Sequence, residues 1–147
     1  MTSEEVATSD YVIPILKVVN LVGVSVELPS PHPVVVLREV ESPWREIRMS
    51  IGYSEGIAIT YAWRRLPSPR PLTHEVWVDI LNQFNISLEV IRIKSVVGSV
   101  YFAEMVLVGG KKTFTVPCRP TDAITLALRQ EYSVPILAAE SVLAGEN

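Results

Sequence analysis

Two acidic segments of the chain contain residue types that could bind a metal ion. Glu55 lies in "SEGIAI" and Asp122 lies in "TDAITL", and the segments align hydroxyl over hydroxyl, acid over acid and isoleucine over isoleucine. This alignment suggests an internal duplication whose pseudo-symmetry could bring the two carboxylates together. A carboxylate pair can hold a divalent cation such as Mg²⁺ or Mn²⁺, which activates water against a phosphodiester. Glu55 and Asp122 are therefore the candidate metal ligands.

Two further residues could complete a site that cleaves phosphodiesters. Arg119 stands at the expected start of a helix, where unpaired N–H groups and an arginine fork can hold a phosphate together. His74, in "RPLTHE", could transfer a proton near neutral pH. The alternative for His74 is a partly buried residue of a helical first turn, bonded to backbone.

Helix capping is the structural explanation of the same residues. Pro120 suits the first helical position, and Asp122 and Glu55 can each reach back to a free amide at a helix start. Arg119 would then pair with one of the two acids. The residues alone leave both explanations open.

A second basic cluster surrounds a proline-rich connector. Arg64, Arg65 and Arg70 lie beside Trp63, a combination that could contact a nucleic-acid backbone and stack on a base. The alternative is a solvated helix end with Trp63 in the core.

The composition bounds the class of protein. The 147 residues carry a net charge of −3 and are 48% hydrophobic, which predicts one globular domain without the basic surface of a bulk nucleic-acid binder. The lone cysteine, Cys118, cannot form an internal disulfide, and we expect a buried, unreactive thiol in a cytoplasmic protein. The apolar content favours a homo-oligomer, and no stretch is apolar enough for a membrane segment. We expect a flexible tail over residues 1–10 and a single domain over residues 11–147.

Hydrophobic periodicity predicts the elements that position these side chains. Alternation indicates two antiparallel strand meanders, the first near 22–28, 34–40 and 46–51 and the second near 86–94, 99–108 and 113–118. Helices are expected near 52–65, 72–84 and 118–129, followed by a short strand at 134–137 and a terminal helical turn over 138–145. The predicted fold class is α+β, with antiparallel strand meanders packed with helices and built from a duplicated β-meander–helix unit.

The same patterns predict which side chains share a face. In the first strand the alternation groups Val22, Val24, Val26 and Leu28 on one half-buried side. In the next helix the spacing groups Ile57, Ala58, Tyr61 and Ala62, and in the helix near 72–84 one stripe groups Leu72, Val76, Trp77, Ile80, Leu81 and Phe84. Thr73 is the expected N-cap of that second helix.

Three ordered motifs carry a resemblance to a known family. The segments "RPLTHE", "GSVYFAEMVL" and "RPTDAITLALR" followed by "VPIL" resemble the bifunctional nuclease domain family, from about Leu16 to the C-terminus. Two departures are that "REIRMSIG" replaces the family's usual Leu-Pro-Ile-Trp-Ile-Gly, and that Gly56 replaces the alanine of Ile-Gly-x-x-Glu-Ala. The resemblance implies an α+β fold with an internal repeat, frequent homo-oligomers, and nuclease activity on both DNA and RNA.

The residues and the resemblance together favour a metal-assisted nuclease. Glu55 and Asp122 would hold Mg²⁺ or Mn²⁺, Arg119 would hold the phosphate, and His74 would transfer a proton. The alternative is a non-catalytic interaction or regulatory module that forms a homo-oligomer. The acidic net charge and the capping explanation favour this alternative.

Overall fold

The computed structural model describes residues 14–145, so the tail predicted over residues 1–10 lies outside the described residues. The first half of the chain runs through β1 (Leu16–Val26), β2 (Pro33–Glu39), β3 (Glu46–Ser50), α1 (Tyr53–Trp63) and α2 (Thr73–Gln83). The second half runs through β4 (Ile86–Val97), β5 (Val100–Gly109), β6 (Lys112–Cys118), α3 (Pro120–Leu128), β7 (Ile136–Ala139) and α4 (Glu140–Leu143). No helix of this range is long and apolar enough to cross a bilayer.

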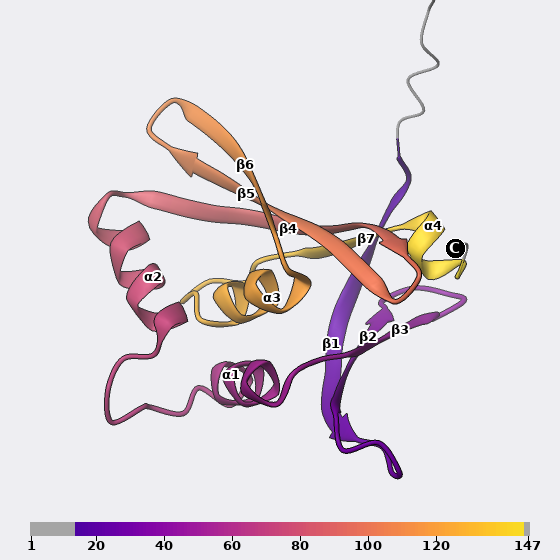
Figure 1. Cartoon of the computed structure of the whole chain (residues 1–147). Helices are drawn as coiled ribbons and strands as arrows, with labels where there is room; N and C mark the ends of the chain where they lie inside the picture. Colours follow the sequence, from indigo (N-terminus) through magenta and orange to yellow (C-terminus); the bar gives the residue numbers. More distant parts are fainter. Residues whose placement is uncertain (1–13, 146–147) are drawn as a thin grey trace, which may run out of the picture.

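The described strands form one sheet in the order β3-β2-β1-β7-β4-β5-β6. The two meanders flank β7, which runs antiparallel to β1 and parallel to β4. The sheet is strongly twisted, and α1 and α3 lie in the angle between its two halves (Figure 1). The α+β class and both antiparallel meanders are therefore confirmed, while the common origin of the two halves stays a prediction.

The tight turns of the second meander follow from glycine. Gly98 and Gly110 adopt φ values of +61° and +62° in the turns that join β4 to β5 and β5 to β6. A residue with a Cβ is sterically disfavoured at such angles, whereas glycine is not.

The prediction of which β1 side chains point to the core is wrong for most of the residues named. Val22 and Val26 are exposed, and Leu28 lies past the strand in the turn. The physical reason is a register shift between Leu21 and Gly23, since one extra residue reverses which side chains point to the core. Of the predicted face, only Val24 packs against the core.

Of the side predicted for α1, only Ala62 is buried. Its buried residues are Gly56, Ile59 and Ala62, whereas Ile57 and Tyr61 are exposed. A Cβ added at Gly56 would lie 3.0 Å from Pro33 Cγ, so glycine allows this helix to approach β2 closely. Gly56 therefore suits the close packing of α1 against Pro33.

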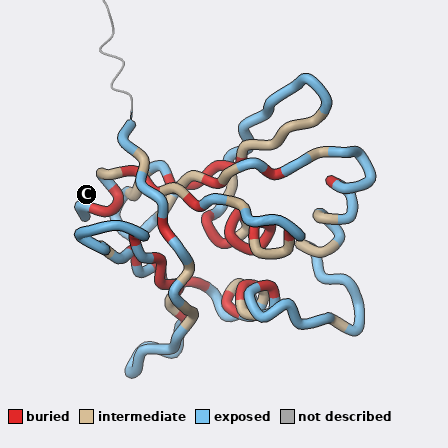
Figure 2. The backbone as a smooth tube through the Cα atoms, turned by 180° about the vertical axis from the view of Figure 1, so that it is seen from behind, coloured by how far each residue is buried: buried red, intermediate tan, exposed pale blue. Residues whose placement is uncertain are grey.

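Helix α3 is the most buried helix of the described chain and runs parallel to α1. Seven of its nine residues are buried (Figure 2), and it packs against β4 and β5. At the N-terminal ends, Thr121 Oγ1 donates to Glu55 Oε1 at 2.7 Å. At the C-terminal ends, Arg65 Nη2 donates to the carbonyl of Gln130 at 3.1 Å. Both helix N-termini therefore open onto the same region.

Helix α2 forms where the apolar spacing predicted it, but this chain leaves most of its stripe uncovered. Only Leu81 is buried, while Trp77 is 51% exposed and Phe84 is 71% exposed. Thr73 is not the N-cap as predicted, because Leu72 takes that position and Thr73 is already helical.

Candidate functional site

The structure brings all four predicted site residues into one contiguous cluster. Glu55 comes from the first turn of α1, His74 from the first turn of α2, and Arg119 and Asp122 from the start of α3. Arg119 lies at the centre, because its guanidinium contacts both acids. The carboxylates predicted to meet thus do lie together, bridged by this cation.

Arg119 holds Asp122 through a two-pronged contact. Its Nε lies 2.8 Å from Asp122 Oδ2 and its Nη2 lies 2.9 Å from Asp122 Oδ1. The third nitrogen, Nη1, lies 3.1 Å from Glu55 Oε1. The side chain of Arg119 is nevertheless 66% exposed, so it remains open to an anion from solvent.

Glu55 is both a cap and a member of the cluster. Its Oε2 accepts a hydrogen bond of 2.8 Å from the backbone N–H of Gly52, which confirms the capping prediction for α1. Its other oxygen, Oε1, accepts a hydrogen bond from the hydroxyl of Thr121 and forms an ion pair with Arg119. Sequence reasoning missed Thr121, although its position beside Asp122 at the helix start was visible.

Asp122 does not cap α3, contrary to the capping prediction for that helix. The N-cap is Arg119, and no side chain caps this helix start. The Asp122 carboxylate instead joins Arg119 to His74, whose Nε2 lies 3.2 Å from Asp122 Oδ1. His74 therefore bonds to a carboxylate and not to the backbone.

The pKa values reflect this pairing. Burial tends to raise the pKa of Asp122, but the hydrogen bonds from Arg119 and His74 outweigh it and hold the pKa below its ordinary value. The hydrogen bond to Asp122 raises the pKa of Arg119. At neutral pH the cluster thus contains an ionised Asp122 and a permanently charged Arg119.

Two hollows flank the cluster. One, of about 430 Å³, is mostly apolar and has His74 and Asp122 on its wall together with Trp77, Met105 and Leu126. The other, of about 230 Å³, is lined in part by Glu55 and Arg119. Cys118 borders the apolar hollow, and burial followed by the charge of Asp122 raises its pKa to about 11. This environment is consistent with the prediction that the Cys118 thiol is unreactive.

The donor set suits a magnesium-type ion only in part. Within residues 14–145, no group of three or more His, Cys, Asp or Glu side chains is arranged to hold a metal ion. Mg²⁺ commonly uses one or two carboxylates and completes its shell with waters and substrate phosphates. Glu55 and Asp122 are the two carboxylates of the cluster, and both pair with Arg119 in this structure.

The second basic cluster lies apart from this site. Arg64 and Arg65 follow the C-terminal end of α1, whereas Glu55 lies at its N-terminal end. Trp63 is 44% exposed, so the alternative that placed it in the core is wrong.

The comparisons with known proteins agree with the motifs that resemble the bifunctional nuclease domain family. The family model described as "bifunctional nuclease domain" matches residues 35–147, and the chain belongs to this family. Two similar proteins are the uncharacterized proteins Rv1829 and MT1877 from two strains of Mycobacterium tuberculosis. Each is 35% identical over 126 residues, which covers 86% of this chain and 73% of the relative.

Proposed function

We propose that this protein is a nuclease that hydrolyses phosphodiester bonds of DNA and RNA at the Glu55–His74–Arg119–Asp122 cluster. The observation that carries the proposal is the exposed guanidinium of Arg119 at the meeting point of two helix N-termini, beside an ionised carboxylate and a histidine. Helix N-termini and an arginine fork are groups that bind phosphate. The name of the family supports the same activity.

Each side chain has a distinct task in the proposed hydrolysis. Arg119 binds the scissile phosphate, and Asp122 orients the guanidinium through its two hydrogen bonds. Water attacks phosphorus and forms a new P–O bond while the bond to the leaving oxygen breaks. His74 accepts the proton that this water loses, and the leaving oxygen takes a proton from solvent. Glu55 and Asp122 would hold Mg²⁺ or Mn²⁺, which when bound supplies Lewis acidity and a more acidic water. The adjacent apolar hollow offers space and the Trp77 ring for an unpaired base, which favours single-stranded substrates.

Cleavage should require a hard divalent cation. We expect purified protein to degrade single-stranded RNA and DNA with added Mg²⁺ or Mn²⁺ and to stop when a chelator is added, because two carboxylates prefer such ions. Gel analysis of end-labelled strands measures this result. Cleavage that continues unchanged in chelator would contradict the role of the ion.

The alternative function is an interaction or regulatory module, and the uncovered stripe of α2 favours it. Val76, Trp77, Ile80 and Phe84 are all exposed on this helix. An apolar face of this kind commonly contacts another protein. We propose that Val76, Ile80 and Phe84 of this face contribute to a homo-oligomer interface.

Substitution of Phe84 by glutamate should weaken self-association. A charge placed in a desolvated aromatic contact should raise the dissociation constant about tenfold or more. Light scattering at tens of micromolar protein measures the change. The neighbouring exposed Gln83→Glu is the matched control and should leave the assembly intact. A wild-type protein that is only monomeric under these conditions would refute the homo-oligomer.

A further inference from the structure

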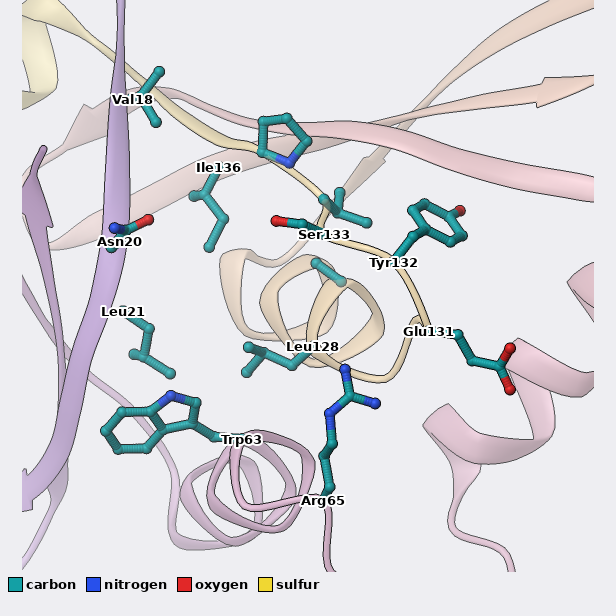
Figure 3. Close-up of a pocket in the computed structure, with 13 residues that line it drawn as sticks. Val18, Asn20, Leu21, Trp63, Arg65, Leu128, Glu131, Tyr132, Ser133 and Ile136 are labelled. Carbon is teal, nitrogen blue, oxygen red and sulfur yellow. The ribbon is translucent and has the colours of Figure 1, made fainter.

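A second cleft lies at the C-terminal ends of α1 and α3, whereas Arg119 lies at the N-terminal end of α3. It measures about 620 Å³ and is formed by β1, the C-terminal ends of both helices and the segment 131–136 (Figure 3). Helix α1 has 11 residues, so its two ends are roughly 16 Å apart at 1.5 Å per residue. The cleft is therefore distinct from the cluster proposed to cleave phosphodiesters, and its volume lies in the range of ligand pockets.

Arg65 stands in this cleft on a backbone conformation that favours glycine. The amide of Arg65 donates to Ala62 O, and the amide of Leu66 donates to Tyr61 O, which is the usual glycine-type helix termination. The equivalent left-handed positions after α2 and α4 hold Asn85 and Gly145, whereas Arg65 has φ +51°. Arginine is less favoured than glycine at such a backbone angle.

The side chain of Arg65 points into the cleft (Figure 3). One nitrogen, Nη2, donates to the carbonyl of Gln130. Among residues 14–145 no carboxylate forms an ion pair with it, and the nearby carboxylate of Glu131 points away from the cleft. The remaining guanidinium N–H groups are thus available to an anion.

The walls around Arg65 combine aromatic surface with hydrogen-bonding groups. The half-exposed Trp63 forms one wall. The hydroxyl of Tyr132 accepts the N–H of Leu88 and donates to its carbonyl, both at 2.9 Å, so this ring is held in place at the rim. Asn20 and Ser133 supply an amide and a hydroxyl to the same cleft.

We propose that this cleft binds a nucleoside monophosphate, with its phosphate on Arg65 and its base against Trp63. Asn20 and Ser133 then contact polar edges of the base or sugar. Inorganic phosphate would leave the aromatic wall unused, and a neutral apolar ligand would desolvate the charge of Arg65 without a partner. The same chemistry is offered by a free nucleotide and by the phosphorylated end of a nucleic-acid strand. The proposal does not depend on the nuclease function.

Isothermal titration calorimetry on the full chain tests this site with AMP, adenosine and inorganic phosphate. AMP should bind at least about tenfold more tightly than either fragment, because only AMP uses both the cation and the aromatic wall. Arg65→Gly should weaken AMP binding at least about tenfold without lowering the melting temperature, since glycine suits the positive φ. Trp63→Leu should also weaken AMP binding, whereas Arg64→Ala, which removes the charge of the neighbouring exposed arginine, should not.

A 5′-phosphorylated oligonucleotide and its unphosphorylated counterpart distinguish the two sources of the ligand. If AMP binds and Arg65→Gly weakens that binding, a free nucleotide is sufficient to occupy the cleft. Phosphate-dependent binding of the strand alone, lost in Arg65→Gly, identifies a strand end and retains the proposed site. Two outcomes would overturn the proposal. In the first, Arg65→Gly binds AMP and the strand as tightly as the wild type does. In the second, neither probe binds the wild type detectably at millimolar concentration.

Discussion

Asp122→Asn should lower metal-dependent cleavage by about 100-fold or more while the protein remains folded. The carboxylate holds Arg119 through two hydrogen bonds and also contacts His74, so the neutral amide weakens the orientation of both groups. It also removes one of the two negative charges proposed to hold the ion. The unfolding free energy should fall by only about 1 kcal/mol, because asparagine still accepts hydrogen bonds and the ion pair is partly exposed. Single-turnover cleavage beside a melting curve measures the two effects.

Asp79→Asn is the matched control for this experiment. Asp79 is an exposed residue of α2, and its neutralisation changes the net charge of the protein by the same amount. It should leave cleavage unchanged. Wild-type cleavage by a pure Asp122→Asn protein would remove the cluster as the catalytic site and leave the interaction module as the better explanation.

Arg119→Ala should weaken binding of single-stranded nucleic acid by about tenfold and flatten its salt dependence by about one charge. The guanidinium is exposed and would lose the direct bond to phosphate that the site is proposed to make. Arg119→Lys should recover the salt dependence but only part of the affinity, because an ammonium cannot form two parallel bonds. Fluorescence anisotropy over a range of salt concentrations measures both quantities.

Lys111→Ala is the control for loss of one positive charge. Lys111 is exposed in the turn between β5 and β6, away from the start of α3. It should alter affinity only slightly. Equal binding curves for wild type and Arg119→Ala, with a lowered melting temperature, would show that Arg119 is a structural bridge between Glu55 and Asp122.

Only one of the two acids caps a helix. Glu55 caps α1 and also pairs with Arg119, so its removal would combine a stability effect with a site effect. Asp122 makes no cap, and its contacts are with side chains of the cluster. Asp122 is therefore the cleaner position at which to test function separately from architecture.

Local pattern predicted the type and order of the elements, although β1 begins at Leu16 and not near Val22. The alternation of apolar residues and the turn glycines Gly98 and Gly110 predicted both meanders, since these signals act over a few residues. The bulge in β1 was not predictable in this way, because it depends on pairing with β2. The uncovered stripe of α2 was equally hidden, since periodicity shows that a face is apolar and not what covers it.

The sequence by itself determined the residue types of the site and their places at helix starts. Glu55, Asp122 and Arg119 were recognisable because carboxylates, proline and arginine at a helix start have known chemistry. Only the tertiary structure decided that α1 and α3 run parallel and that β7 lies between the meanders, which brings 55, 74, 119 and 122 together. Such contacts join positions up to 66 residues apart, and their geometry is set by packing of the whole core and not by local preference.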